Sequence, residues 1–220
     1  MTLSVTLIII IITVIISLFA FRSQKVMDDL IFYPVAVTGK NQYYRFITYG
    51  FIHANIPHLF FNMYAFYLFG GVCENSFIDI FGNSGKLFYV LLYFLALIVS
   101  VIPDFFKHRS NYNYMSLGAS GAVSAIVFAY IMFDPLRGIG LFFIPIFIPG
   151  FLFGILFIII SYFLGKKGGT SINHSAHIWG ALFGVAFIII FSEIFSTYPL
   201  LDHFIASVKG LDPHKIISTP

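Results

Sequence analysis

The stretch that decides the fold is residues 174–194, HSAHIWGALFGVAFIIIFSEI. It is an almost continuous apolar run, and a helix needs about 20 such residues to cross roughly 30 Å of hydrocarbon. Gly180 and Gly184 are four residues apart, the spacing that lets two spanning helices touch. The stretch therefore predicts a membrane-spanning helix that packs closely against another helix.

The rest of the chain has the same apolar character. Of its 220 residues, 59% are hydrophobic and only 10% are charged. A soluble domain carries about 25% charged residues because its surface faces water, so an ordinary globular domain is excluded. The small net charge of +3 argues against nucleic acid as a partner. The single cysteine, Cys73, can form neither an internal disulfide nor a Cys/His metal framework.

Five further apolar runs lie between charged or turn-rich breaks. We therefore predict an all-α polytopic membrane protein, a single six-transmembrane-helix bundle over residues 1–220 with a short tail at 195–220. The first run has no positively charged segment before it and no small-residue cleavage site before Arg22, so we interpret it as a retained span and not a signal peptide. The expected spans are 3–21, 56–74, 86–103, 116–133, 139–164 and 174–194.

Three segments outside a regular span also carry predictions. The first loop, 22–55, is too aromatic and apolar for a free linker, so we expect it to fold onto the membrane surface. The fifth span should be kinked or loosely packed. It contains Pro145, Pro149, Gly150 and Gly154. In the tail, apolar residues at helical spacing predict a short interfacial helix. They are Leu200, Leu201, Phe204, Ile205 and Val208.

Polar groups inside a membrane span are costly and mark functional sites, and four of those in the predicted spans stand out. They are His58 and Asn62 in the second span, Ser120 in the fourth and His177 in the sixth. Loops one, three and five lie on one side of a six-span chain and lead into these spans. Each residue lies within the first two turns, so all four should share a depth of roughly 5 to 10 Å below one membrane face. We expect them to meet in one site.

These four residues are the parts of nucleophilic acyl transfer. A serine hydroxyl needs a base to take its proton, and a neutral histidine does this near pH 7. Ser120 and His177 could form such a catalytic pair. His58 and Asn62, on one helical face, could stabilise the oxyanion together with the Ser120 N–H. Taken singly, each residue is more often a packing residue than a catalyst, and only their conjunction favours chemistry.

Glycines surround the two reacting residues. Gly118 and Gly121 keep the backbone around the serine small, and Gly180 and Gly184 allow the sixth helix to approach it. His174 lies three residues before the predicted base, but no third ligand accompanies this pair. We therefore predict no metal and no other cofactor.

Several separated blocks resemble the rhomboid family of intramembrane serine proteases, from about Tyr44 to Val185. Tyr44-Arg45 is similar to the Trp-Arg pair of the family's first loop. The segment HANIPHLFFNMYAFYLFGGVCE, with His53, His58, Asn62 and Glu74, is similar to the H…HLxxN…G…E helix. LGASGAVSAI resembles the GxSG block, HSAHIWGALFG the AHxxGxxxG block, and PLRGIGLFFIPIFIPG the fifth span.

The resemblance implies that Ser120 attacks the peptide carbonyl and that His177 is the general base and then the acid. His58, Asn62 and the Ser120 N–H would hold the oxyanion, and Glu74, at the far membrane face, would be structural. It also implies membrane-spanning protein substrates within the lipid bilayer, admitted beside the fifth span. That span would act as a gate, and Gly165-Lys166-Lys167-Gly168-Gly169 as a mobile cap.

Two positions depart from the family pattern. The family often has an aromatic residue four positions after the nucleophile, beneath the base, where this chain has Ser124. We expect Trp179 or a neighbouring phenylalanine to orient His177 instead. The second departure is Tyr44 for tryptophan, which keeps an amphipathic aromatic side chain at the interface.

Other classes of membrane protein fit less well. A zinc protease would need HExxH, which the sequence lacks, and an aspartyl protease would need paired aspartates inside spans. A transporter would need a charged residue at mid-membrane. The main alternative is a non-catalytic rhomboid-like scaffold that binds membrane helices and directs their trafficking or turnover.

The orientation in the membrane receives two conflicting predictions. Loops one, three and five hold eight lysines and arginines and the opposite side holds four, which by the positive-inside rule puts the N-terminus outside the cytoplasm. The family resemblance implies a cytoplasmic N-terminus, in the cell (plasma or inner) membrane, with the active site open to the non-cytoplasmic face. We adopt the second prediction, because several loop cations could serve the folded loops.

Overall fold

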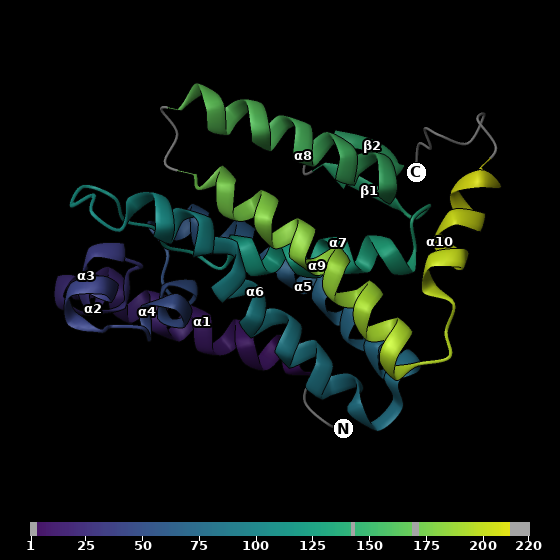
Figure 1. Ribbon diagram of the computed structural model, residues 1–220, viewed down its shortest axis with the longest axis horizontal. Helices are drawn as coiled ribbons and strands as arrows, with labels where there is room; N and C mark the ends of the chain where they lie inside the picture. Colours follow the sequence, from purple (N-terminus) through teal and green to yellow (C-terminus); the bar gives the residue numbers. More distant parts are fainter. Residues whose placement is uncertain (1–3, 142–143, 169–171, 212–220) are drawn as a thin grey trace.

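The computed structural model describes residues 4–141, 144–168 and 172–211 (Figure 1). Its helices pack side by side, with α7 among α5, α6 and α9, while α8 lies outermost. The helices are α1 (Val5–Arg22), α2 (Gln24–Leu30), α3 (Pro34–Lys40), α4 (Arg45–Thr48), α5 (Ile56–Phe81), α6 (Gly85–His108), α7 (Ser120–Phe133), α8 (Gly150–Lys167), α9 (His174–Phe195) and α10 (Leu200–Lys209). Two 3₁₀ turns, η1 (Tyr49–Phe51) and η2 (Gly82–Ser84), and two antiparallel strands, β1 (Gly138–Leu141) and β2 (Ile144–Pro149), complete the described elements.

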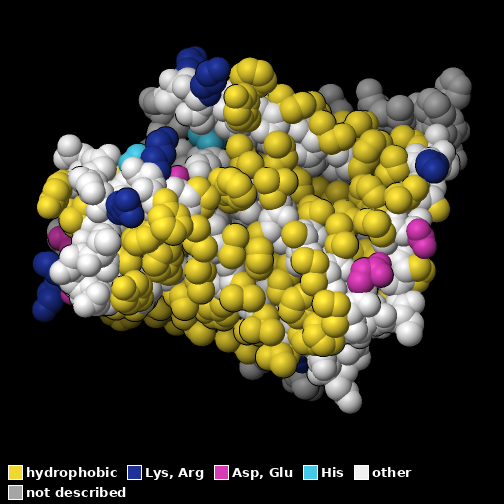
Figure 2. Space-filling view, in the orientation of Figure 1, with side chains coloured by type: hydrophobic (Ala, Val, Ile, Leu, Met, Phe, Trp, Pro, Cys, Tyr) yellow, Lys and Arg dark blue, Asp and Glu magenta, His cyan; other side chains and the backbone are white. Residues whose placement is uncertain are grey.

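The chain is an integral membrane protein of the all-α polytopic class. Four helical stretches are long and apolar enough to cross a membrane, and their hydrophobic side chains cover the flank seen in Figure 2, with most charged groups at its ends. The second stretch contains both α5 and α6, so the expected count of six spans stays a prediction. The four stretches are Val5–Arg22, Ile56–His108, Gly150–Lys167 and His174–Phe195.

Helix α7 is the centre of the core. With 14 residues it is only about 21 Å long. Every residue from Gly121 to Met132 is buried, so this helix is surrounded by protein and not by lipid.

The expected helix over 139–164 is wrong in its first part. Gly138–Leu141 and Ile144–Pro149 instead form two antiparallel strands in which Ile139 pairs with Ile148 and Gly140 with Phe147, and the helix begins only at Gly150. The Phe147 side chain covers both glycines of β1, because a Cβ at Gly138 or Gly140 would lie 2.9 Å from it. A short apolar run does not distinguish strand from helix by periodicity, which is why the sequence alone missed the two strands.

The first loop is folded, as its aromatic content predicts. Arg45 is buried and donates to the carbonyl oxygens of Asp28 at 2.7 Å and Ile31 at 2.6 Å, which ties α4 to α2. Fully buried Phe32 packs on Phe46 and Tyr49, with ring centroids 5.2 and 5.6 Å away. The tail also forms the expected short helix, α10, anchored by Leu200, which is 1% exposed.

Glu74 lies at the other end of the bundle and closes the start of α1. Its carboxylate accepts hydrogen bonds from the Ser4 hydroxyl at 2.6 Å and from the backbone N–H groups of Val5 and Thr6 at 2.9 and 3.0 Å. A carboxylate at a helix N-terminus satisfies free N–H groups and complements the helix dipole. These contacts are those of a structural residue.

Candidate active site

Ser120 is the first residue of α7, where the chain turns from an extended segment into the helix. Two residues earlier, Gly118 has a φ of +108°, and a Cβ there would lie 2.9 Å from His58 Cε1. Its N–H donates to the Tyr49 carbonyl oxygen at 2.9 Å. Both the dihedral angle and the close approach require glycine, and together they place Ser120 beside the helix that carries His58.

The start of α5 orients His58 and Asn62. The Asn55 side chain caps the helix by accepting from the His58 N–H at 2.8 Å. The Ala54 N–H donates to His58 Nδ1 at 3.4 Å, which assigns the ring proton to Nε2. One turn later, Asn62 Nδ2 donates to the His58 carbonyl oxygen at 3.0 Å. An amide has two N–H donors, so one remains for another acceptor.

His177 lies in the first turn of α9, which Asn173 caps by accepting from the Ala176 N–H at 3.0 Å. Its ring stacks on Phe157 of α8, with centroids 6.0 Å apart and an interplanar angle of 28°. Phe157 in turn packs on Phe128 of α7, 5.6 Å away. The base position therefore rests on an aromatic side chain supplied by another helix.

Phe157 supplies the aromatic contact to His177 that Ser124 cannot provide. Of the two kinds of residue expected to orient His177, a neighbouring phenylalanine is the one in contact, whereas Trp179 is 45% exposed and lines a different cavity. Phe157 is one apolar residue in a run of similar ones on α8. Its spacing therefore carries no signal that could single it out in the sequence.

Glycines bring α7 and α9 into backbone contact. A Cβ at Gly180 would overlap the Gly121 carbonyl oxygen, and one at Gly184 would overlap that of Ala125. On the other side of α7, a Cβ at Gly121 would lie 2.5 Å from Ser100 Oγ. The predicted close packing of these glycines is thus present, and it holds the start of α9 beside the start of α7.

One cavity of about 270 Å³ is lined by Ser120, His177, His58 and Asn62 together. The structure therefore brings together the four residues that the sequence singles out. The other walls are mainly apolar, with phenylalanines from α5, α7 and α8, namely Phe61, Phe69, Phe128, Phe153 and Phe157. A second cavity of about 560 Å³ also includes Ser120 and His58 and extends toward the loops, so the serine lies between an apolar pocket and an opening with both polar and apolar walls.

Sequence reasoning quoted His53 but gave it no role. It is fully buried, and its Nδ1 lies 3.0 Å from Ser17 Oγ, which donates to the Phe51 carbonyl oxygen at 2.9 Å. Nδ1 therefore carries the proton, and Nε2 accepts from the Ala119 N–H at 3.5 Å. Burial, with a smaller contribution from His58, lowers the pKa of His53 to about 3. A neutral His53 links α1 to the residue just before Ser120.

Asn173 connects the start of α9 to α6 and to the loop before α7. Its Nδ2 donates to Asp104 Oδ2 at 2.7 Å, and the Tyr114 and Ser116 hydroxyls lie within 3.1 Å of the same nitrogen. This side chain also caps α9, so one amide fixes the start of the helix that carries His177. In the sequence, Asn173 could be recognised only as an asparagine that precedes a predicted helix.

Comparison with known proteins identifies the family of this chain. The profile of the Rhomboid domain matches residues 40–194. The chain belongs to the rhomboid family. The mouse mitochondrial presenilin-associated rhomboid-like protein is 29% identical over 140 residues, and its human counterpart 27% over 140 residues. The matched region is 63% of this chain but 35% of each of these relatives, so the chain spans about a third of their length. Rhomboid protease GlpG of Haemophilus influenzae is 26% identical over 174 residues, 76% of this chain and 81% of GlpG.

The rhomboid chain offers no group of three His, Cys, Asp or Glu side chains close enough to hold a metal ion within residues 4–141, 144–168 and 172–211. His174 and His177 have ring centroids 5.9 Å apart. Of the expected cap, residues 165–167 are the last turn of α8 and not loop, and residue 169 lies outside the described residues.

Proposed function

We propose that this protein is an intramembrane serine endopeptidase that cleaves membrane-spanning protein substrates with a Ser120–His177 dyad. The observation that carries the proposal is the single cavity lined by Ser120, His177, His58 and Asn62. Membership of the rhomboid family supports it, as does similarity to a bacterial relative named a rhomboid protease.

In the proposed reaction, Ser120 Oγ attacks the carbonyl carbon of the substrate peptide bond while its proton passes to His177. The carbon–nitrogen bond breaks as His177 returns the proton to the leaving amine, and the acyl group stays on Ser120 as an ester. Water then attacks the ester, and His177 moves a proton from the water to Ser120 Oγ. The acid product leaves and the dyad is restored.

Three donors would stabilise the negative oxygen of each tetrahedral intermediate. His58 presents Nε2–H, because its Nδ1 already accepts from Ala54. Asn62 has one amide hydrogen beyond that bonded to the His58 carbonyl oxygen. Ser120 begins α7, so its N–H has no intrahelical partner. Donors held in an apolar cavity are worth more than donors in water.

Helix α8 and the strands before it are the proposed point of access for a substrate helix. Only Gly150, Gly154 and Ser161 of this 18-residue helix are buried, and it lies at the outside of the bundle (Figure 1). The apolar side of the cavity is walled by Phe153 and Phe157 from the same helix. A small outward movement of α8 would open the cavity to the bilayer.

Cleavage of a single-span model substrate by the purified protein tests the proposal. We expect product bands from the wild type and none from Ser120→Ala or His177→Ala. A serine-directed fluorophosphonate should label the wild type and not Ser120→Ala. Substrate binding without cleavage, with equal behaviour of all three proteins, would favour the non-catalytic scaffold.

We also propose a cytoplasmic N-terminus, with the site open to the non-cytoplasmic face of a plasma or inner membrane. The buried Arg45, bonded to carbonyl oxygens of α2, supports this by removing one of the loop cations from the topology count. Impermeant thiol labelling of single cysteines in a Cys73-free variant tests it. In intact cells the loop before α5 should react, and the turn between α5 and α6 should not.

A further inference from the structure

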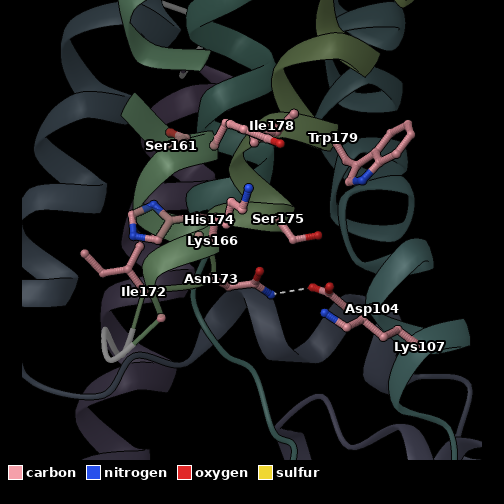
Figure 3. A pocket seen from close by; sticks show the side chains of 13 residues that line it. Asp104, Lys107, Ser161, Lys166, Ile172, Asn173, His174, Ser175, Ile178 and Trp179 are labelled. Atoms are coloured by element: carbon pink, nitrogen blue, oxygen red, sulfur yellow. Dashed lines mark hydrogen bonds between the residues drawn. The ribbon is translucent and has the colours of Figure 1, made fainter. Parts of the chain in front are cut away.

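A third cavity lies at the same end of the bundle as the cavity that contains Ser120 and His177. It has a volume of about 660 Å³ and is enclosed by the last turns of α6 and α8 and the first turns of α9. It shares only Ile172 with the cavity of Ser120 and His177. Figure 3 shows Lys107 and Asp104 on one side of it, Lys166 and His174 on the other, and Ser175 between them.

His174 is the first observation that points to a ligand. Its side chain is 7% exposed and lines the cavity, and both ring nitrogens are buried without a hydrogen-bond partner among the described residues. A buried polar group left unpaired destabilises the fold. A ligand atom that entered the cavity and paired with this ring would remove that cost.

The charges around the cavity favour an anion. Lys107 lies in the last turn of α6 and Lys166 in the last turn of α8, and neither forms an ion pair with any described residue. Asp104 is the one carboxylate in the lining, and its Oδ2 already accepts from the Asn173 amide. Two lysines against one aspartate leave the ionised lining groups with a positive balance. Figure 2 shows histidine between dark-blue side chains at this end of the molecule.

The start of α9 adds neutral donors to these charges. Ser175 lines the cavity, in the first turn of a 22-residue helix. The N–H groups of Ala176 and His177 are taken by Asn173. Ser175 is therefore the hydroxyl donor that this helix start places in the lining, beside the lysines and the positive end of the helix dipole. This combination of groups is typical of phosphate sites.

The flank of the cavity belongs to the lipid-facing surface. Trp179 is 45% exposed and Tyr162 is 56% exposed, and both line the cavity. Tryptophan and tyrosine gather at the level of lipid head groups, where lysines also extend to the interface. If a phospholipid placed its phosphate here, its acyl chains would extend along the exposed faces of α8 and α9.

We propose that this cavity binds the phosphate group of an anionic phospholipid between Lys107, Lys166, Ser175 and His174. The site is independent of the proposed protease chemistry, so it can be tested in the Ser120→Ala protein as well as in the wild type. Each lysine should favour an anionic over a zwitterionic lipid by roughly fivefold.

Trp179 is the only tryptophan of the chain and reports on the cavity directly. The full chain is reconstituted in phosphatidylcholine vesicles that contain a small fraction of either dibrominated phosphatidylglycerol or dibrominated phosphatidylcholine. We expect stronger quenching of Trp179 by the glycerol lipid, and loss of this excess in the Lys107→Gln/Lys166→Gln variant. His174→Phe should reduce the excess as well. Equal quenching by both lipids, or an excess unchanged in the double variant, would overturn the proposal.

Two controls separate the cavity from general attraction and lipid from free phosphate. Lys167→Gln removes the neighbouring exposed charge of α8, which does not line the cavity, and should keep the excess quenching that Lys166→Gln lowers. Millimolar inorganic phosphate should not displace the brominated lipid. Displacement would assign the site to free phosphate and overturn the lipid assignment. Thermal unfolding in detergent verifies the fold, and added phosphatidylglycerol should raise the midpoint of the wild type but not of the double variant.

Discussion

Helices in this molecule pack in two different ways. α7 and α9 are in close contact, whereas α8 is packed loosely against the bundle. α7 and α9 meet backbone to backbone through Gly121, Gly180 and Gly184, and α7 is buried on all sides. α8 turns most of its residues outward and touches the core mainly through aromatic side chains. Ser120 and His177 lie on the close contact, and the proposed access lies on the loose one. A helix held by side chains alone moves at a lower cost than one held by backbone contact, which suits α8 to the proposed access.

The largest expected effect comes from adding a methyl group at each contact. Gly180→Ala places a Cβ on the Gly121 carbonyl oxygen, so the helices must separate, and we expect destabilisation of about 3 kcal/mol or more. Gly154→Ala on α8 puts its Cβ in ordinary contact, 3.4 Å from Phe128, and should be neutral or stabilising by up to about 1 kcal/mol. Unfolding midpoints in detergent measure both. Equal midpoints for the two variants would remove the distinction between the contacts.

Asn62→Ala tests the proposed stabilisation of the oxyanion beside Ser120. Loss of one oxyanion donor should lower kcat by roughly 10²–10³ with little change in KM, since the donor acts mainly in the transition state. Kinetics with a reconstituted single-span substrate give both parameters, and the unfolding midpoint serves as the control for folding. An unchanged kcat would exclude Asn62 from oxyanion stabilisation.

Acid should lower the stability of the fold through protonation of His53. The pKa of this buried ring is lowered from 6.5 to about 3, so the folded protein resists protonation that the unfolded chain accepts. Its contribution to stability is complete above pH 6.5 and is lost progressively as the pH falls toward 3, with about 2 kcal/mol gone by pH 5. Denaturant unfolding from pH 7 to pH 5 measures this slope. His53→Gln should flatten the slope, and an equally steep slope in that variant would assign the acid sensitivity elsewhere.

The smallest effect tests the one place where the loose helix supports the dyad. Phe157→Leu keeps apolar volume but removes the ring stacked on His177. It should reduce kcat/KM roughly fivefold, which corresponds to about 1 kcal/mol of activation free energy. Trp179→Leu, on an exposed face away from the cavity of Ser120 and His177, is the matched control and should leave kcat/KM within a factor of two or so of wild type. Equal losses in both variants would show that Phe157 has no special role.

Much of this molecule could be predicted because the bilayer imposes simple rules. A membrane helix must be long and apolar, so α1, α5, α6, α8 and α9 were visible as hydrophobic runs. Polar side chains in such runs are rare and costly, which made Ser120, His177, His58 and Asn62 stand out. Strands β1 and β2 could not be predicted, because their residues are as apolar as those of a helix and only cross-strand pairing distinguishes them.

The sequence by itself determined the solvent, the helical class and the identity of the four candidate site residues, because hydropathy and residue chemistry are local properties. Only the tertiary structure decided which neighbours serve them. The stacking of Phe157 on His177 and the link from His53 to Ala119 each join segments far apart in the chain, and the burial of both His174 nitrogens without a partner also results from packing. Such relations depend on how helices pack, and one apolar or histidine residue carries no mark in the sequence of what it will touch.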